Sequence, residues 1–439
     1  MQEKQDIQGI RNAEVQSARE KQTIREAVHN LGAKAKAAAA ETALLRTEDK
    51  NRILTQMATA LRNDSDLILA KNAIDVAAAK EKDLSSAFID RLTLTPGRIE
   101  DMAKGLEDLV ALKDPVGEVL GGWKGAQDIE ISKVRVPIGV IGMIYEARPN
   151  VTADAAGICF KTGNAVLLRG SGEAKESNIA IVAALRRAIA EAGGPEDAVQ
   201  LLQETSREAA AEMMRMNRYL DLLIPRGGAG LIQTVVEEST VPVIETGIGN
   251  CHVYVDASAD QQMALEILIN AKTQRPGVCN AAESLLVHEA IAAEFLPIAD
   301  KALTALGVEL RACPESLPYL PGATAAAEED HEAEFLDLIL SVKTVGSLDA
   351  AIRHINTYGT KHTEAIITKD YNAARRFTAQ IDAAVLMVNA STRFTDGGMF
   401  GFGAEIGIST QKLHARGPMG LEEMTTVKYI VQGEGQSRL

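Results

Sequence analysis

The pattern of hydrophobic and polar positions divides the chain into a helical first part and an alternating remainder. The stretch from Glu14 to Arg46 is rich in Ala, Glu, Lys, Arg and Gln, which are good helix formers. Thr47 and Thr95 precede two further helical stretches as expected N-caps. We predict that residues 1–30 form a helical extension, either an arm or a partly disordered segment, without a catalytic role.

From residue 129 onward, β-branched runs punctuated by Pro and Gly predict strands. Residues 162–195 and 220–240 each show a strand, a glycine-containing turn and a helix. The run VPVIETG, residues 241–247, is interpreted as one more strand. Alternating β and α elements of this length predict a parallel sheet that helices cover on both faces.

A second α/β module is expected after Asp256. Residues 259–272 have helical spacing, TQRPGVCNAA forms a loop, ESLLVH is a strand, and residues 290–307 form another helix. Earlier in the chain, residues 127–138 are expected to form an extended hairpin, and near the end GLEEMTTVKYIVQG finishes in an alternating strand pattern. The sequence therefore predicts an α/β fold with two parallel-sheet domains.

Composition limits the classes of protein to which the chain can belong. Its 439 residues are 46% hydrophobic with 13 prolines, so the chain can bury sizeable cores. The four cysteines show no CxxC pairing, and no apolar run approaches the length of a membrane span, so a cytoplasmic protein is expected. A net charge of −14 argues against a general nucleic-acid binder, and an anionic substrate would need a locally basic pocket.

Two groups of residues carry candidate chemistry. Gly227 and Gly228 form a turn between a strand and a helix, where free N–H groups can bind phosphate, although such a turn is often only a tight turn. Arg169 and Ser171 end a neighbouring strand and could reach the same phosphate, or Arg169 could be solvated. Cys279 lies in a loop between small and polar residues; it is either a reachable nucleophile or a small buried apolar residue.

Longer motifs around these residues resemble a known family. VIETG followed by RPGVCNAA resembles the paired signature of the aldehyde dehydrogenase superfamily, with Glu245 and Cys279 standing 34 positions apart (279 minus 245). Within it, the chain from about residue 31 to the end resembles the glutamate-5-semialdehyde dehydrogenase family, also called the gamma-glutamyl phosphate reductase family. The stretches that carry this resemblance are YEARPNVTADAAGICFKTGNAVLLRGS, QRPGVCNAAESLLVH and VNASTRFTDGGMFGFGAEIGIST.

The resemblance implies an aldehyde dehydrogenase-like fold with a nucleotide-binding domain, a catalytic domain and a small β oligomerisation flap. It also implies a homo-oligomer. The expected division is a helical extension over 1–30, an NADP-binding domain over 31–125 and 140–255, a catalytic domain over 256–410, and a flap over 126–139 and 411–439.

The implied activity is the NADPH-dependent reduction of L-glutamyl 5-phosphate to L-glutamate 5-semialdehyde in proline biosynthesis. Cys279 would displace phosphate to form a thioester, and this step needs no metal. A functional link to glutamate 5-kinase, which would supply the acyl phosphate, is implied as well. Two alternatives remain: a CoA-acylating or hydrolytic oxidoreductase of the same superfamily, or a non-catalytic nucleotide-binding protein that kept the fold.

Two further catalytic residues follow from the resemblance. Glu245 could help to deprotonate Cys279 or act as a general acid when the thiohemiacetal collapses, or it could be a strand-end carboxylate bound to backbone. Asn150 is the nearest match to the side-chain donor of the oxyanion site, although counting back from the TGN turn puts Glu146 at that position. The alternative for Asn150 is a helix N-cap.

Binding residues are carried over in the same way. The implied NADPH contacts are Arg169, Ser171, Gly227, Gly228 and Glu334, where Glu334 could also belong to a solvated acidic loop. The substrate carboxylate needs a cation or a cluster of donors. The implied substrate-binding residues are Arg148, Ser391, Thr392 and Arg393, and the sequence does not rank the two arginines.

Overall fold

The structure is a computed structural model that describes residues 2–438, with side chains described for residues 21–86 and 88–438. Among the described residues, no helix is long and apolar enough to cross a membrane. The chain divides into two compact units. Unit 1 contains residues 1–244, 402–406 and 420–439, and unit 2 contains residues 245–401 and 407–419.

Unit 1 begins with one long helix, α1 (Gln2–Thr42). The helical extension expected over residues 1–30 is therefore the first part of a helix that runs on into the unit. Its later turns pack across β3, β4 and β5 and against α8. Lys36 Nζ donates to both carboxylate oxygens of Asp221 at 2.7 and 2.8 Å, and this ion pair joins α1 to the rest of the unit.

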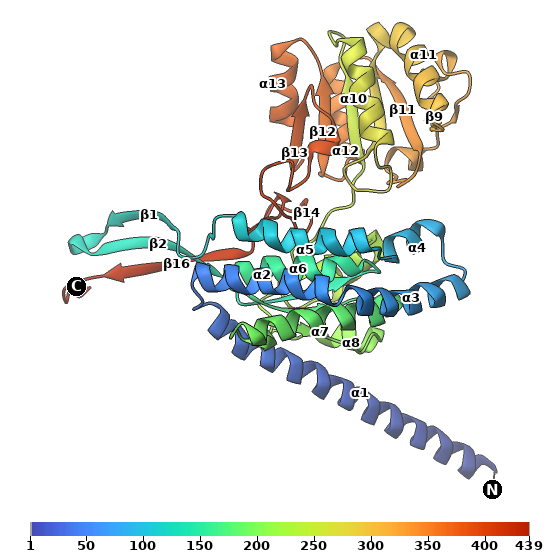
Figure 1. Ribbon diagram of the computed structural model, residues 1–439. Helices are drawn as coiled ribbons and strands as arrows, with labels where there is room; N and C mark the ends of the chain where they lie inside the picture. Colours follow the sequence, from blue (N-terminus) through green and yellow to red (C-terminus); the bar gives the residue numbers. More distant parts are fainter. Residues whose placement is uncertain (1, 439) are drawn as a thin grey trace. The chain divides into compact units, whose positions relative to one another are not determined.

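Four more helices precede the first sheet, and α2, α3 and α5 form a layer over α6 and α7 (Figure 1). Thr95 caps α5 as expected, because its hydroxyl accepts from Arg98 N. The expected cap at Thr47 is wrong: Thr47 is the first residue of α2, and Arg46 is the N-cap residue. The bounds are α2 (Thr47–Asn63), α3 (Ser65–Glu81), α4 (Ser86–Leu92) and α5 (Pro96–Ala111).

The centre of unit 1 is a four-stranded parallel sheet in the order β5-β4-β3-β6, which alternates with helices as predicted. Arg169 and Arg226 are the last residues of β4 and β6, so both lie at the carboxyl edge of this sheet. The bounds are β3 (Val140–Tyr145), α6 (Pro149–Lys161), β4 (Ala165–Arg169), α7 (Lys175–Glu191), β5 (Val199–Leu201), α8 (Arg207–Met213), β6 (Leu222–Arg226) and α9 (Ala229–Glu238).

The strand expected over residues 241–247 does not form. In this stretch of unit 1, only Val243 makes a single parallel bridge, to Leu223 of β6. Pro242 lacks the N–H group that a strand inside a sheet must donate, which explains why the pairing does not extend.

A three-stranded antiparallel sheet completes unit 1, in the order β1-β2-β16. The expected flap omitted its first strand, because β1 lies at residues 119–124 and pairs with β2; the hairpin expected over 127–138 is therefore wrong. Residues 411–419, which were expected in the flap, belong to unit 2. The bounds are β1 (Val119–Lys124), η1 (Ala126–Asp128), β2 (Glu130–Pro137) and β16 (Thr425–Gln432).

Unit 2 is built on a seven-stranded parallel sheet in the order β10-β9-β11-β8-β7-β12-β13. The domain boundary expected after residue 255 falls instead between Ile244 and Glu245, because β7 (Cys251–Val255) is an inner strand of this sheet. The other elements are α10 (Gln261–Thr273), β8 (Ala282–His288), α11 (Glu289–Ala305), β9 (Glu309–Ala312), β10 (Thr324–Ala325), β11 (Ile339–Val345), α12 (Leu348–Tyr358), β12 (Thr363–Ile367), α13 (Tyr371–Gln380), β13 (Val385–Val388), β14 (Ile408–Ser409) and β15 (Gly417–Pro418).

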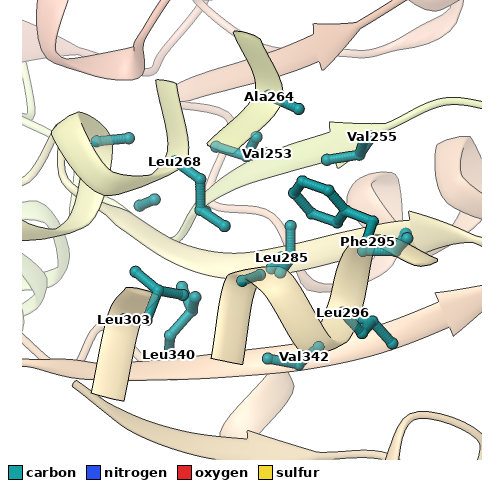
Figure 2. Packing of buried hydrophobic residues seen from close by; sticks show 14 of the residues in the cluster. Val253, Val255, Ala264, Leu268, Leu285, Phe295, Leu296, Leu303, Leu340 and Val342 are labelled. Atoms are coloured by element: carbon teal, nitrogen blue, oxygen red, sulfur yellow. The ribbon is translucent and has the colours of Figure 1, made fainter. Parts of the chain in front are cut away.

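Alternate residues of the unit 2 strands face two separate cores. Val253 and Val255 of β7 pack with α10 and α11, and Figure 2 shows Leu268 and Phe295 of those helices beside them. Tyr254, between the two valines, faces the opposite core, which is shared with α12 and α13. Burial on both faces fits a parallel sheet that helices cover on each side, so the predicted α/β fold with two parallel-sheet domains and a small β sheet is confirmed.

Short 3-10 helices join the longer elements of the two units. They are η2 (Gly172–Ala174), η3 (Glu196–Ala198), η4 (Leu317–Tyr319), η5 (Glu328–His331) and η6 (Thr392–Phe394). Two of them begin beside predicted site residues, since Ser171 is the N-cap residue of η2 and Ser391 is the N-cap residue of η6.

Candidate active site

Cys279 lies in the loop between α10 and β8 and is partly exposed, unlike the three other cysteines, which are buried. Two contacts, from Gly249 and from Cys251, hold its backbone carbonyl in place. A Cβ atom on Gly249 would lie 1.5 Å from Cys279 O, so only glycine allows these two backbones to touch. Cys251 Sγ donates to the same carbonyl oxygen at 3.2 Å. Burial raises the pKa of the Cys251 thiol, so this group keeps its proton and remains a donor.

Glu334 meets the same backbone junction. Its Oε1 accepts a hydrogen bond from Gly249 N at 2.6 Å, and burial raises the pKa of this carboxyl. The chain just before Glu334 is fixed as well, because Asn250 Nδ2 donates to His331 O at 2.8 Å. Glu334 therefore does not belong to a solvated acidic loop. It is hydrogen-bonded to Gly249, the residue whose backbone contacts Cys279.

A buried ion pair lies on the other side of the cysteine loop. Lys272 Nζ and Glu283 Oε2 are 2.5 Å apart, and both side chains are fully buried. Burial lowers the pKa of Lys272 and raises that of Glu283, while each charge opposes the shift of the other. The second oxygen of Glu283 accepts from Leu336 N at 3.2 Å, and Leu336 has a φ of +54° that disfavours a leucine. The ion pair thus holds the loop that carries Glu334.

Glu245 is partly buried and begins unit 2, four residues before Gly249. Its backbone N–H donates to Gln411 Oε1 at 3.2 Å, which fixes the main chain at this point. The same segment is tied to β14 by a bridge between Thr246 and Ser409. Glu245 therefore belongs to the segment that reaches, four residues later, the contact between Gly249 and Cys279.

The substrate-binding residues expected in unit 2 have different environments. Ser391 is buried, and its hydroxyl caps η6 by accepting from Arg393 N. The hydroxyl of Thr392 is buried and has no partner among the described residues. Arg393 Nε donates to Gln274 Oε1 at 2.7 Å. Burial is the main cause that lowers the pKa of Arg393, while the Cys279 sulfur acts in the opposite direction.

The cofactor residues expected in unit 1 lie at the carboxyl edge of its sheet. The guanidinium of Arg169 donates to Thr205 O at 2.6 Å and to Ser206 O at 3.3 Å, so this arginine is not simply solvated. Its Nε and the hydroxyl of Ser171 are buried polar atoms without a partner among residues 21–86 and 88–438. Two orphaned polar groups at the end of one strand are consistent with a polar ligand there.

The glycine turn expected near the pyrophosphate joins β6 to α9. Gly228 is the N-cap residue of α9, and its N–H donates to Glu146 Oε1 at 2.9 Å. A Cβ on Gly227 would lie 2.7 Å from the Glu146 carboxyl carbon. Glu146, which the TGN count placed at the oxyanion position, therefore accepts a hydrogen bond from this turn.

Arg148 and Asn150 lie at the start of α6. The N-cap alternative for Asn150 is wrong, because Pro149 occupies the first turn and Arg148 is the N-cap residue. The amide of Asn150 instead donates to Asp154 Oδ2 at 3.1 Å, one helical turn later. Arg148, Asn150 and Asp154 line one cavity together with Arg226.

The structure thus brings Cys279 and Glu334 to one junction in unit 2, and Arg148 and Asn150 to one cavity in unit 1. Sequence reasoning missed the residues that support them, which are Gly249, Cys251, Lys272, Glu283, Asp154 and Arg226. Their contacts join residues distant in sequence, apart from the spacing of four between Asn150 and Asp154, which places two polar side chains on one helix face.

Comparison with known proteins identifies the family. The aldehyde dehydrogenase family model matches residues 5–315 and 331–430. This match to the wider family begins in α1.

Individual relatives are similar over nearly their whole length. The chain is 60% identical to a gamma-glutamyl phosphate reductase of Heliobacterium modesticaldum over 407 residues, covering 93% of this chain and 98% of that protein. It is 59% identical to one of Moorella thermoacetica, covering 94% and 98%. The crystal structure of a gamma-glutamyl phosphate reductase from Thermotoga maritima matches with a TM-score of 0.91 and 49% identity, covering 94% of this chain and all of that one. The chain belongs to the aldehyde dehydrogenase family and, within it, to the gamma-glutamyl phosphate reductases.

Proposed function

We propose that this chain reduces L-glutamyl 5-phosphate to L-glutamate 5-semialdehyde with NADPH and releases phosphate, as a step of proline biosynthesis. The structure around Cys279 supports the proposal independently of the similarity to known proteins. Cys279 is partly exposed, and its carbonyl is fixed by Gly249 and by the Cys251 thiol. A cysteine with a rigid backbone and a reachable sulfur suits nucleophilic catalysis.

The chemistry follows from the bonds that change. The Cys279 thiolate attacks the carbonyl carbon of the acyl phosphate, the C–O bond to phosphate breaks, and a thioester remains. NADPH, when bound, supplies a hydride to the thioester carbon. The resulting thiohemiacetal breaks its C–S bond, which gives the aldehyde and restores Cys279. Each tetrahedral stage carries negative charge on oxygen, for which the Cys279 N–H and the Asn150 amide are the proposed donors.

A nicotinamide cofactor fits the residues at the carboxyl edge of the unit 1 sheet. Gly228 is the N-cap residue of α9, and although its own N–H donates to Glu146, the helix start that follows it is suited to a phosphate. Arg169 and Ser171 offer orphaned polar atoms after β4. We propose NADPH rather than NADH because a guanidinium at the end of β4, on Arg169, would suit a 2′-phosphate. In unit 2, Glu334 is the proposed acceptor for a ribose hydroxyl.

Glu245 is proposed as the proton-transfer residue for Cys279, either at thiol deprotonation or at collapse of the thiohemiacetal. Arg393, with Ser391 and Thr392, is proposed to bind an anionic group of the substrate. Support for Arg393 comes from its hydrogen bond to Gln274, which directly follows α10 and precedes Cys279 by five residues. A cation there also favours the thiolate form of the nucleophile.

The decisive assay couples the enzyme to a glutamate kinase, because the acyl phosphate is too labile to be supplied directly, and follows NADPH oxidation. Cys279→Ser is expected to reduce turnover by at least about 10³-fold while NADPH binding stays unchanged. Cys313→Ser is the matched control, since Cys313 is a buried free cysteine of the same unit and should leave turnover intact. Substantial turnover by Cys279→Ser would remove this residue from the mechanism.

The acyl acceptor separates this activity from others on the same fold. In the reverse direction, NADP reduction with glutamate 5-semialdehyde should require phosphate and should not occur with CoA in its place. Activity with CoA and without phosphate would instead indicate an acylating aldehyde dehydrogenase.

We also propose a cytoplasmic homo-oligomer that is functionally linked to a glutamate 5-kinase. The four cysteines, all within the described residues, form no disulfide, which fits a reducing compartment. Both β1 and β16 are edge strands of the three-stranded sheet, and Trp123 and Tyr429 pack edge to face on it while about half exposed. Exposed aromatic side chains beside open strand edges favour self-association. Sedimentation of the purified chain tests this assignment.

A further inference from the structure

Unit 1 contains a small cavity of about 70 Å³ at the start of α6. It is lined by the carboxyl-end residue of β6, by the first turns of α6 and by residues 405 and 406. Its polar lining consists of Arg148, Asn150, Asp154, Arg226 and Glu405. Two guanidinium groups, two carboxyl groups and an amide therefore share one small space.

Asp154 is partly buried in this lining. Burial raises the pKa of its carboxyl to about 6, while the Asn150 amide and the Arg226 charge oppose that shift only in part. Asp75 of the same unit, which is buried, has more hydrogen-bond donors around its carboxylate. Asp75 accepts from Ser177 N, from Ser177 Oγ and from Glu176 N. Because Asp154 has one neutral donor in place of three, a ligand cation would stabilise its charged form.

Arg226 is the complementary group. It is partly buried at the end of β6, and within residues 21–86 and 88–438 its guanidinium makes no hydrogen bond or ion pair. An arginine in a cavity presents a planar pair of donors that matches a carboxylate. The lining thus offers a binding group for an anion and another for a cation in one cavity.

We propose that this cavity binds the head group of an L-α-amino acid, with Arg226 pairing with the α-carboxylate and Asp154 with the α-ammonium. The inference rests on the proposed function, for which it assigns the residues that recognise the glutamyl moiety. It differs from the sequence-derived assignment, which considered only Arg148, Ser391, Thr392 and Arg393 for the substrate. Glu405 and Arg148 complete the charged lining of the cavity.

Such a site disfavours a ligand that lacks one of the two charged groups, because one protein charge then stays unpaired. An analogue without the amino group leaves Asp154 without its cation, and an analogue without the α-carboxylate leaves Arg226 without its anion. Sites built in this way reject ligands that lack one polar group far more strongly than apolar pockets reject a missing methylene. Selectivity between such analogues is therefore the property to measure.

The experiment uses the reverse reaction, with NADP and phosphate saturating, and compares kcat/KM for three aldehydes. Glutamate 5-semialdehyde has both groups, 5-oxopentanoate lacks the amino group, and 4-aminobutanal lacks the carboxylate. The wild-type chain should prefer the complete substrate by about 10³-fold over each analogue. Asp154→Asn should lower the preference over 5-oxopentanoate by about 10²-fold and leave the preference over 4-aminobutanal in place. Arg226→Gln should show the opposite pattern.

Asp75→Asn is the matched control, because it removes a buried aspartate of the same unit and should leave both preferences unchanged. Thermal unfolding of each variant verifies that it is folded. If Asp154→Asn and Arg226→Gln lower kcat/KM equally for all three aldehydes, the two residues are structural and the inference is overturned.

A binding measurement separates this inference from the proposed function. Calorimetric titration with L-glutamate, glutarate and 4-aminobutanoate reports on the cavity without any turnover. If the wild-type chain lacks phosphate-dependent activity but binds L-glutamate in preference to both analogues, and each variant loses its own preference, the cavity assignment holds and the proposed function fails. If activity is present but neither kinetics nor binding depends on Asp154 and Arg226, the function holds and the cavity assignment fails.

Discussion

The loop around Cys279 and the cavity at the start of α6 are built on opposite principles. Around Cys279 the backbone is fully held by contacts within the protein. Gly249 packs against the Cys279 carbonyl and Cys251 donates to it. The buried pair of Lys272 and Glu283 holds the neighbouring loop through Leu336 N. In the cavity, Asp154 and Arg226 are charged groups that the protein leaves incompletely paired. The first region is complete as it stands, whereas the second is completed by a ligand.

This difference predicts opposite responses to the removal of charge. A nucleophile needs a fixed position, since a displacement of about 1 Å costs about 10²-fold in rate. A recognition site needs charged groups that the protein itself does not neutralise, and such groups lower the stability of the unliganded protein. Removing a charge near Cys279 should therefore destabilise the protein, and removing one in the cavity should stabilise it.

The largest effect is expected at the buried ion pair. Glu283→Gln leaves Lys272 without a carboxylate inside the protein, so it should lower the free energy of unfolding by about 3–5 kcal/mol. The matched control is the double variant Lys272→Met, Glu283→Gln, which removes both charges and keeps an acceptor for Leu336 N. Urea unfolding should show that the double variant recovers most of the loss. Equal losses in the single and the double variant would show that the pair is not the stabilising contact.

Asp154→Asn should have the opposite sign. The pKa of Asp154 is raised by burial to about 6 from an ordinary value of 3.8, so ionisation costs stability as pH rises through this interval. The variant should therefore be more stable than wild type at pH 7 by up to about 3 kcal/mol, with no difference below about pH 4. Denaturant unfolding between pH 4 and pH 8 measures this. A variant less stable than wild type at pH 7 would contradict the account of the cavity.

Gly249→Ala tests the position of Cys279 directly. The new Cβ would lie 1.5 Å from Cys279 O, so the cysteine backbone must move, and kcat should fall by about 10²-fold or more. The rate of Cys279 alkylation should change in parallel. Gly322→Ala is the control, because nothing lies within 4 Å of a Cβ at that position. Normal turnover by Gly249→Ala would show that this contact is not needed.

The smallest effect is expected at the cofactor edge of unit 1. If Arg169 binds the 2′-phosphate, Arg169→Ala should weaken NADPH binding about 10-fold more than NADH binding, which is the loss of one charge-assisted contact. Fluorescence titration with both cofactors measures the ratio. Equal weakening would mean that Arg169 acts only through its hydrogen bonds to Thr205 O and Ser206 O.

Much of the fold followed from the sequence because its elements carry local signals. Strand β4, the loop after it and α7 were predicted from one stretch, and the Pro-Gly turn with the strand after it placed Cys279 between α10 and β8. Strand β7 was missed, since CHVYV follows VPVIETG closely and the two apolar runs compete. The choice between them is made by Pro242, which interrupts pairing, and by the neighbours of β7 in the sheet.

The site was predicted only as far as motifs reach. Cys279, Glu334 and the turn at Gly227 and Gly228 stand in recognisable patterns, and the structure brings Glu334 to the Cys279 junction. The contact between Gly249 and Cys279 joins residues 30 positions apart (279 minus 249), and no local pattern indicates it. The raised pKa of Asp154 results from its burial, which depends on the packing of α6, so the sequence alone did not indicate it.

The central claim is that Cys279 carries the glutamyl group as a thioester that waits for hydride. It is tested most directly by mixing the enzyme with kinase-generated glutamyl phosphate in the absence of NADPH and measuring both phosphate release and the mass of the Cys279 peptide. The account predicts close to one equivalent of Cys279-dependent phosphate, one glutamyl group on that peptide, and its loss when NADPH is added. Sustained phosphate release that needs Cys279 but not NADPH, or no adduct on Cys279, would contradict it.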